Sequence, residues 1–492
     1  MTEAAMPRWA FAALVAAMGA ATVGALAAGS GNPFVAAAPV LAGSAVWAVT
    51  RLPLRQTLSV LLLAVLAIDN PQERPAAGEW KSPLYPIGSL LFENLSKVTG
   101  VDALRFALID LLLVGLVALA LLRGSGERNG AERPPKVLTV SLLVALAGLA
   151  AGLAWGFVRG GDLKGALWQV RQLVAFPVLG LLFLSAFREP RHFAALGKIV
   201  VGAAAFRTLE GAYFYEVICR PRDFKPPYVT THSDTMLFAL AILLLVVFWN
   251  EARTRKSFWA MVLGGLWLLL GIYLNGRRLA YVTLGASAFA VFLLAPWTRL
   301  KRAVARVALA SIPVALLYVA VGWNASGGVF RPAQTVKSIL VSSADRSTQT
   351  RDIENFNLAM TLKSNPLLGT GFGHEYLELS RADDISRLFP QYRLIPHNSL
   401  LGLWAFAGLF GFWLLFLPVV VAIFLAVRAY RLAPTPLTRT LALSPVLMAI
   451  AYLLQAYGDM GLQSWGGAFL LAAALAAPGL LAVRTGAWPT QQ

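Results

Sequence analysis

Apolar runs of about 20 residues, the length that a helix needs to cross a bilayer, recur along almost the whole chain. Of the 492 residues, 58% are hydrophobic and only 13% are charged, and the mean hydropathy is +0.66. A soluble domain could not bury so much apolar surface. We therefore predict an all-α, polytopic integral membrane protein with about 12 to 14 transmembrane helices. The candidate spans are residues 9–28, 34–50, 56–69, 105–122, 136–155, 166–186, 193–212, 234–249, 258–275, 279–297, 304–322, 398–427, 438–457 and 465–483.

The positive charge of the chain lies in short clusters between the apolar runs. The net charge is +18, but it is not gathered on one face of a domain, so nucleic acid is not an expected partner. If the N-terminus is cytoplasmic, every inner loop is rich in Lys and Arg, as the positive-inside rule requires. Both termini are then predicted to be cytoplasmic. Two outer turns break the rule, one with Arg220 and Arg222 and one with Arg277 and Arg278.

One long polar segment, residues 323–397, interrupts the apolar pattern. It divides the chain into N-terminal helices (1–322), a large outer loop (323–397) and C-terminal helices (398–492), which together form a single membrane domain. Within the loop, residues 347–363 predict an amphipathic helix, and the Gly-rich stretch 365–373 predicts its end and a turn. A phosphate-loop interpretation of this stretch is disfavoured, because no strand precedes it and no Lys-Ser/Thr pair follows.

The outer loop ends at Pro396-His397-Asn398-Ser399, where the next predicted span begins. Asn398 and Ser399 can cap that helix and Pro396 restricts the approach of the chain, so the His397 ring is expected at a fixed position. Imidazole is the side chain best suited to move a proton near neutral pH. His397 is therefore the candidate general base. The competing interpretation is an interfacial histidine that is hydrogen-bonded to the backbone.

Arginines of the two exceptional outer turns are candidate ligands for a strongly anionic group. Arginine makes bidentate contacts to phosphate and keeps its charge. The competing interpretations are snorkelling to lipid phosphates for Arg277 or Arg278, and a solvated loop for Arg220 and Arg222. Arg351 lies on the predicted loop helix, where an exposed face is its default explanation.

No metal site, cofactor or disulfide is expected. Cys219 is the single cysteine, and no Asp-x-Asp triplet occurs in the chain. Apart from the candidate base, the histidines are isolated from carboxylates at metal-ligand spacing. They are His192, His232 and His374.

Few ionisable residues lie within the predicted spans, and they are not aligned along one helix as a proton relay would be. They are Asp110, Arg171, Arg207 and Glu210. No internal repeat is evident either, although transporters are commonly built from repeats. A transporter or flippase for lipid-linked sugar is therefore the weaker interpretation, and a structural scaffold is a third one.

Three motifs resemble those of the bacterial O-antigen ligase and polymerase superfamily. His397-Asn398 with Gly408-Leu409-Phe410-Gly411 resembles its His-Asn-x9-Gly-x-x-Gly signature, and Arg351 with Asn365–Gly371 is similar to its Arg … Pro-Leu-x-Gly-x-Gly loop. Gly276-Arg277-Arg278-Leu279 resembles its Ser-Arg-containing turn. The chain departs from the family at Thr231-His232-Ser233, where Asn-Pro-Asn is usual.

The resemblance implies a metal-independent glycosyltransferase that works at the periplasmic face of the bacterial inner membrane. Its donor would be a polyprenyl-diphosphate-linked glycan, and its acceptor a hydroxyl of a glycan or of a lipid-linked glycan. Through these motifs, the resemblance assigns the roles of one base and of several diphosphate or loop contacts to residues of this chain. They are His397 as base, one arginine from each exceptional turn at the diphosphate (Arg278 or Arg277, and Arg220 or Arg222), and Arg351 and Asn398 as possible loop contacts.

Two reactions of this superfamily remain open on the sequence. Polymerisation of polysaccharide repeat units, with inversion at the anomeric carbon, is slightly preferred over ligation onto a lipid A core, because no sequence feature demands lipopolysaccharide. A flippase and a chain-length regulator are the protein partners expected of a polymerase.

Overall fold

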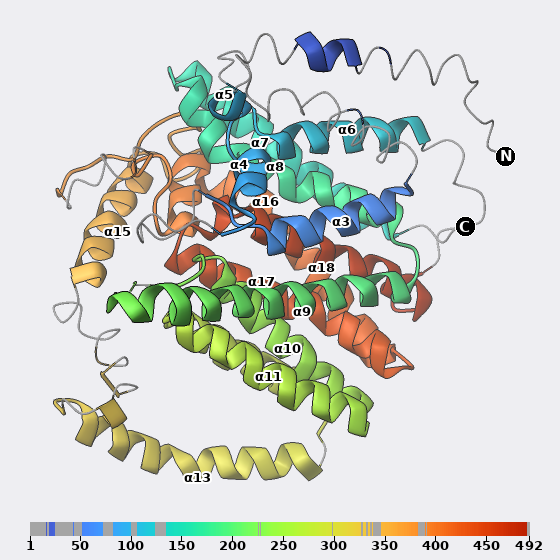
Figure 1. Cartoon of the computed structure of the whole chain (residues 1–492), viewed down its shortest axis with the longest axis vertical. Helices are drawn as coiled ribbons and strands as arrows, with labels where there is room; N and C mark the ends of the chain where they lie inside the picture. The colour runs from blue at the N-terminus through green and yellow to red at the C-terminus, as the bar shows by residue number, and fades with distance from the viewer. Residues whose placement is uncertain are drawn as a thin grey trace, which may run out of the picture. The chain divides into compact units, whose positions relative to one another are not determined.

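The computed structural model is mostly helical in the part of the chain that it describes (Figure 1). In that part no β-strand occurs, and one isolated bridge joins Asn94 to Ala107. The described residues are 16, 19–24, 43, 52–71, 82–99, 106–123, 134–224, 226, 228–297, 299–325, 328–330, 333–334, 337, 346–381, 389 and 391–489.

The helices of the described residues confirm the predicted all-α, multi-pass membrane protein. Nine of them are long and apolar enough to cross a membrane, and three shorter apolar helices accompany them. The predicted spans 9–28 and 34–50 lie almost wholly outside the described residues. Each of the other predicted spans coincides with one of these helices.

Two compact units make up the chain, residues 1–64 with 68–130 and residues 65–67 with 131–492. The helices of the first unit are α3 (Leu54–Ala67), of which the last three residues count with the second unit, α4 (Tyr85–Phe92), α5 (Leu95–Thr99) and α6 (Leu108–Arg123). In the connection between α3 and α4, Ser82 Oγ donates a buried hydrogen bond of 2.5 Å to Asp69 Oδ2.

The second unit is a helical bundle that contains all of the motifs described above. Its most buried span is α18, which packs against α8, α16 and α17. Its elements are α7 (Lys136–Val158), α8 (Leu163–Ala186), α9 (Pro190–Tyr213), η1 (Phe214–Cys219), η2 (Arg220–Arg222), α10 (Asp234–Ala252), α11 (Arg255–Asn275), α12 (Leu279–Leu294), α13 (Arg299–Gly322), η3 (Gly328–Phe330), α15 (Arg346–Ser364), α16 (Ser399–Leu432), α17 (Pro436–Gly458), η5 (Gly461–Gln463) and α18 (Trp465–Arg484).

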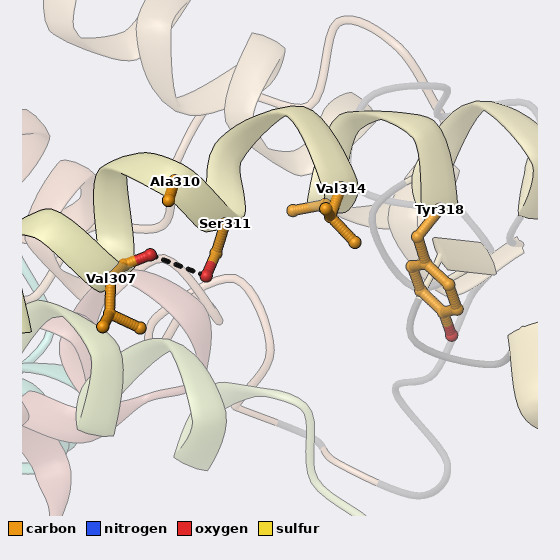
Figure 2. Close-up of a pocket in the computed structure, with 6 residues that line it drawn as sticks. Val307, Ala310, Ser311, Val314 and Tyr318 are labelled. Atoms are coloured by element: carbon orange, nitrogen blue, oxygen red, sulfur yellow. Dashed lines mark hydrogen bonds between the residues drawn. The ribbon is translucent and has the colours of Figure 1, made fainter.

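Helix α13 presents an apolar row of side chains along one face (Figure 2). Val307 and Val314 are 66% and 68% exposed, which suits a helix surrounded by lipid. The hydroxyl of Ser311 is satisfied within the helix, because Ser311 Oγ donates a 2.7 Å hydrogen bond to the carbonyl of Val307. The other polar group of the row, the Tyr318 hydroxyl, donates to the carbonyl of Val329 in η3.

Helix α16 is interrupted at Gly408, which has φ +66° and ψ −177°. The turn that follows α15 lies against this break. Gly371 N–H donates to the carbonyl of Phe406 at 2.8 Å, and Leu409 N–H donates to the carbonyl of Pro366 at 2.9 Å. Backbone groups freed at a helix break inside a membrane protein need such partners. The Gly-rich stretch 365–373 is thus a packed turn that completes the hydrogen bonding of α16.

Candidate active site

Helix α15 carries three polar side chains on one face at positions i, i+3 and i+4, namely Arg351, Glu354 and Asn355. Its bounds agree with the amphipathic helix predicted at residues 347–363. Glu354 is only 7% exposed in its side chain, and Asn355 Oδ1 accepts a 2.9 Å hydrogen bond from Asn398 Nδ2. This face of α15 therefore lies against the start of α16.

His397 is bound by the carboxylate of Glu354 through two groups. The backbone N–H of His397 donates to both oxygens of Glu354, at 3.2 and 3.1 Å, and the ring Nδ1 lies 3.3 Å from Oε1. An ionised carboxylate can only accept, so Nδ1 carries the proton in this contact and Nε2 is left as the basic nitrogen. No described residue is hydrogen-bonded to Nε2. The arrangement is that of an imidazole general base oriented by a carboxylate.

The start of α16 is capped as the sequence predicts for Asn398, whose side chain accepts a 3.1 Å hydrogen bond from Leu401 N–H. Ser399 has another role. Its Oγ donates to the carbonyl of Ala456 at 2.9 Å and accepts from Leu462 N–H at 3.3 Å, which joins α16 to the end of α17 and to η5. His397 is therefore followed directly by two anchored residues.

A second histidine and carboxylate form a cluster with Arg277. His232 Nδ1 contacts Asp459 Oδ2, and Arg277 Nη2 contacts His232 Nε2. Arg277 Nη2 also lies 3.8 Å from Asp459 Oδ2, and its guanidinium lies 4.7 Å from the centre of the Tyr228 ring. The members come from the turn before α10, the α11–α12 turn and the end of α17.

The backbone joins this cluster to the candidate base. Met460, which follows Asp459, donates its N–H to the carbonyl of His397 at 2.8 Å. Arg351 lies one turn before Glu354 on α15, and the carboxylate of Glu354 accepts from the backbone N–H of His397. The structure therefore brings His397, Arg351 and Arg277 to one end of the bundle.

Electrostatics at this end favour a charged Asp459. Burial by itself would raise the pKa of this carboxyl, but its hydrogen bond to His232 and the charges of Arg277 and Arg351 lower the pKa below its usual value. For Arg277, burial lowers the pKa, and the charge of Asp459 opposes that effect. An arginine stays protonated even so. The cluster thus holds a partly buried cation beside an ionised carboxylate.

The other candidate arginines lie at the surface. Arg278 is an exposed residue directly before α12. Arg220 Nη1 pairs with Glu216 Oε2 at 2.6 Å, and both side chains are more than half exposed. Arg222 is exposed as well. The structure does not show Arg220 or Arg222 in contact with the cluster around Arg277.

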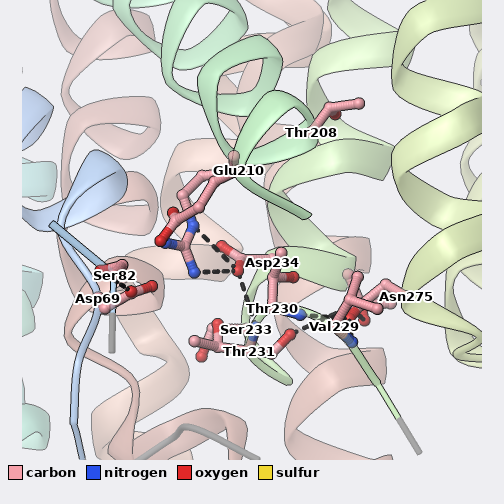
Figure 3. Close-up of polar contacts among 12 residues, drawn as sticks. Asp69, Ser82, Thr208, Glu210, Val229, Thr230, Thr231, Ser233, Asp234 and Asn275 are labelled. Atoms are coloured by element: carbon pink, nitrogen blue, oxygen red, sulfur yellow. Dashed lines mark hydrogen bonds and ion pairs between the residues drawn. The ribbon is translucent and has the colours of Figure 1, made fainter. Parts of the chain in front are cut away.

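The turn that carries His232 is fixed by polar side chains of two helices, α10 and α11 (Figure 3). Asn275 Oδ1 accepts from the N–H groups of Val229 and Thr230 at 3.3 and 3.2 Å, and its Nδ2 donates to the carbonyl of Thr231 at 3.1 Å. Asp234 Oδ2 accepts from Thr231 N–H at 2.9 Å. The buried turn is therefore hydrogen-bonded along most of its backbone.

Arg207 supports this turn from α9. Its Nε and Nη2 donate to Asp234 Oδ2 at 3.2 and 2.7 Å, and its Nη1 pairs with Glu210 Oε2 at 2.5 Å. Arg207 is 1% exposed, and a buried charge of this kind needs such partners. The ionisable residues predicted within this span thus form an ion-pair network that holds Asp234.

Sequence reasoning missed Glu354 and the role of His232. The signal for Glu354 was present, because it lies three residues after Arg351 and so shares a helical face with it. No local signal could have joined His232 to Asp459, which is 227 residues away in the sequence. His374 and His192 contact Gly156 and Phe187.

A central part of the chain, which includes most residues of this site, matches a known protein family. Residues 263–416 match the family model described as O-antigen ligase. The match supports the O-antigen ligase and polymerase superfamily that the motifs resembled. It includes Arg277, Arg351, Glu354 and His397, whereas His232 and Asp459 lie outside it. No curated protein sequence matches the chain significantly.

An O-antigen ligase-type domain in a multi-pass membrane protein indicates an enzyme that transfers glycosyl groups. Lipid-linked glycan is the class of substrate that the family suggests.

Proposed function

We propose that the protein transfers a glycan from a polyprenyl diphosphate to an acceptor hydroxyl, with His397 as general base. The observation that carries the proposal is the contact of His397 Nδ1 with Glu354, which leaves Nε2 without a hydrogen bond to any described residue. Arg351 precedes Glu354 by one turn of α15, and the backbone of Met460 links His397 to the cluster of Arg277. A base and fixed positive charge are the two groups that this reaction needs.

In the proposed reaction His397 Nε2 takes the proton of the acceptor hydroxyl. The acceptor oxygen forms a bond to the anomeric carbon as the bond from that carbon to the diphosphate oxygen breaks, and the diphosphate leaves with the electron pair. Attack from the face opposite the leaving group inverts the anomeric carbon. Glu354 stabilises the imidazolium that forms, as the carboxylate does in other histidine-based sites.

The leaving diphosphate is proposed to lie against Arg277 and Arg351. Guanidinium groups offset the negative charge that develops there, and their charge does not depend on pH in the physiological range. Arg278, in the same turn as Arg277, and the surface residues Arg220 and Arg222 remain predicted contacts for the diphosphate. Diphosphate is already a good leaving group, so the proposal invokes no metal.

We propose polymerisation of polysaccharide repeat units at the periplasmic face of the inner membrane, with a lipid-linked glycan as acceptor. The support is the predicted topology, in which both termini are cytoplasmic and the 323–397 loop is outside. A flippase would supply the donor to that face, and a chain-length regulator would act on the product.

The test compares His397→Gln with His192→Gln in purified protein reconstituted into nanodiscs with a lipid-linked repeat unit. We expect His397→Gln to lower the rate of transfer about 10²- to 10⁴-fold. We expect His192→Gln, whose ring packs on Phe187 at the start of α9, to act as wild type. Undiminished transfer by His397→Gln would exclude it as the base.

The same assay separates the reactions. Growth of polymer from the lipid-linked repeat unit alone supports the proposal. Product that forms only when a lipid A core is added would identify a ligase. In protein reconstituted into sealed liposomes, movement of donor across the bilayer without any transfer, unchanged in His397→Gln, would identify a flippase.

A further inference from the structure

His232 is an unexpected member of the site, because its ring lies between an anion and a cation. Its Nδ1 contacts Asp459 Oδ2, and its Nε2 contacts Arg277 Nη2. An ionised carboxylate only accepts hydrogen bonds and a guanidinium only donates them. A neutral imidazole with the proton on Nδ1 satisfies both contacts at once. An imidazolium would satisfy Asp459 but would present an N–H to the guanidinium.

The position of the ring is determined by the hydrogen bonds on either side of it. Asn275 and Asp234 fix Val229, Thr230 and Thr231, as described above (Figure 3). On the other side, Gln455 Nε2 donates to the carbonyl of His232 at 3.3 Å. The His232 and Tyr228 rings also form a T-shaped pair, with the ring centres 4.3 Å apart. A histidine that served only to fill space would not need this support.

Arg277 depends on His232 for an acceptor. Its Nε is buried without a hydrogen-bond partner among the described residues, and its Nη2 is held by His232 and, more distantly at 3.8 Å, by Asp459. The flat guanidinium lies over the Tyr228 ring. Loss of the Nε2 acceptor would therefore leave Arg277 with a long ion pair and a ring contact, neither of which fixes its rotation.

We propose that His232 is a positioning residue that holds the guanidinium of Arg277 at the donor diphosphate. Asp459 accepts the proton of His232 Nδ1 in a hydrogen bond and so keeps Nε2 of His232 as the acceptor for Arg277. The proposal rests on the proposed function, in which Arg277 contacts the diphosphate. It adds to that function the dependence of donor binding on a second imidazole, His232, which takes no part in the transfer reaction.

A consequence for pH follows from the groups that face the ring. These are Asp459 from the end of α17, Arg277 from the α11–α12 turn, Tyr228 from its own turn and the neutral Gln455 from α17, with the charge of Arg351 on α15 also acting on Asp459. Protonation of Nε2 removes the acceptor of Arg277 and places two cations in contact. Donor binding should therefore weaken at acidic pH.

The test measures binding of a glycan-free polyprenyl diphosphate to nanodisc protein at about pH 8 and about pH 5, the limits between which imidazole side chains titrate. All variants carry His397→Gln, which removes the other imidazole of the site and stops turnover. The His232→Gln variant keeps an oxygen acceptor that cannot be protonated, and His232→Ala removes the acceptor.

We expect His232→Ala to bind the probe about 10- to 100-fold more weakly than its parent at about pH 8, the range for loss of a hydrogen bond to a charged group. We expect His232→Gln to bind as its parent at about pH 8 and to lose less affinity than its parent at about pH 5. The His232→Gln variant and its parent bind the same probe, so the titration of the diphosphate affects both equally and does not contribute to the difference between their pH responses. Equal binding by His232→Ala, or an equal acid response in His232→Gln, would overturn the proposal.

The proposed function can fail separately from this inference. If wild-type protein transfers no glycan but the binding pattern holds, the reaction is wrong and His232 still positions Arg277 at a diphosphate. If His397→Gln abolishes transfer while His232→Ala binds the probe like its parent, the reaction stands and the role of His232 is wrong.

Discussion

The carbonyl of His397 accepts a 2.8 Å hydrogen bond from the N–H of Met460, which directly follows Asp459 in the sequence. Met460 has φ +34°, in the left-handed region that few residues other than glycine adopt. Backbone strain of this kind costs about 1–3 kcal/mol and is found where the surrounding structure imposes it. The bond fixes the candidate base relative to the Asp459, His232 and Arg277 cluster.

Glu354→Gln should lower kcat about 10²- to 10⁴-fold, the range for loss of effective general-base catalysis, with little change in the KM for donor. The amide can still accept from the backbone N–H of His397, but it can present its NH2 group to Nδ1 and favour the other tautomer. Steady-state kinetics in nanodiscs give both constants. The control is Glu375→Gln, an exposed residue 3.4 Å from Arg393 Nη1, which should act as wild type. A normal kcat for Glu354→Gln would show that the carboxylate does not orient the base.

Much of the fold could be predicted from the sequence, because the length of an apolar run determines whether a helix can cross a bilayer. Helix α15 and the turn after it also followed from local signals, the pattern of residues 347–363 and the glycines at 369, 371 and 373. These glycines have φ values from +70° to +94°, a range that glycine adopts readily and other residues rarely adopt.

The composition of the site could be predicted only in part. His397 and Arg277 belong to motifs that lie within single turns, so their types and spacing are visible in the sequence. The pairing of His232 with Asp459 depends on how α10 packs against α17, and side-chain periodicity does not specify which helices are neighbours. Long-range contacts of this kind require the structure.

Arg277→Lys should lower kcat/KM for the lipid-linked donor about 10- to 100-fold, the range for loss of a hydrogen bond to a charged group. Lysine keeps the positive charge but cannot contact His232 and a diphosphate oxygen with one planar group. Kinetics with donor as the varied substrate provide the measurement. The matched control is Arg428→Lys, an exposed arginine that lies over Phe424 on α16. Equal losses in both variants would indicate a general effect on the membrane protein.

Asp459→Asn should destabilise the protein by about 1–3 kcal/mol near neutral pH, because His232 and Arg277 lose an ionised partner. The folded-state pKa of Asp459 is lowered, so its carboxylate contributes stability above the unfolded value of about 3.9, and this contribution is lost as the pH falls through the lower folded value. The unfolding temperature of the variant should therefore lie below that of wild type between about pH 5 and 8, and this difference should narrow below about pH 4. Asp352→Asn, at an exposed position of α15, is the control. A difference that does not narrow below about pH 4 would contradict the assignment.

Gly156→Ala should impair folding and transfer although it removes no reactive group. A Cβ at this position of α7 would lie 1.9 Å from the carbonyl oxygen of Phe372, which belongs to the turn that completes α16 at Gly408. Overpacking of this kind costs about 1–3 kcal/mol or displaces the backbone, and here the displaced segment connects α15 to the site. The matched control is Gly285→Ala on α12, where a Cβ meets no atom within 4 Å and the helix should be unaffected or slightly more stable. Thermal unfolding and transfer rates of the two variants test this directly. If Gly156→Ala unfolds at the wild-type temperature and keeps the wild-type rate, the close packing of the turn on α7 does not support the site.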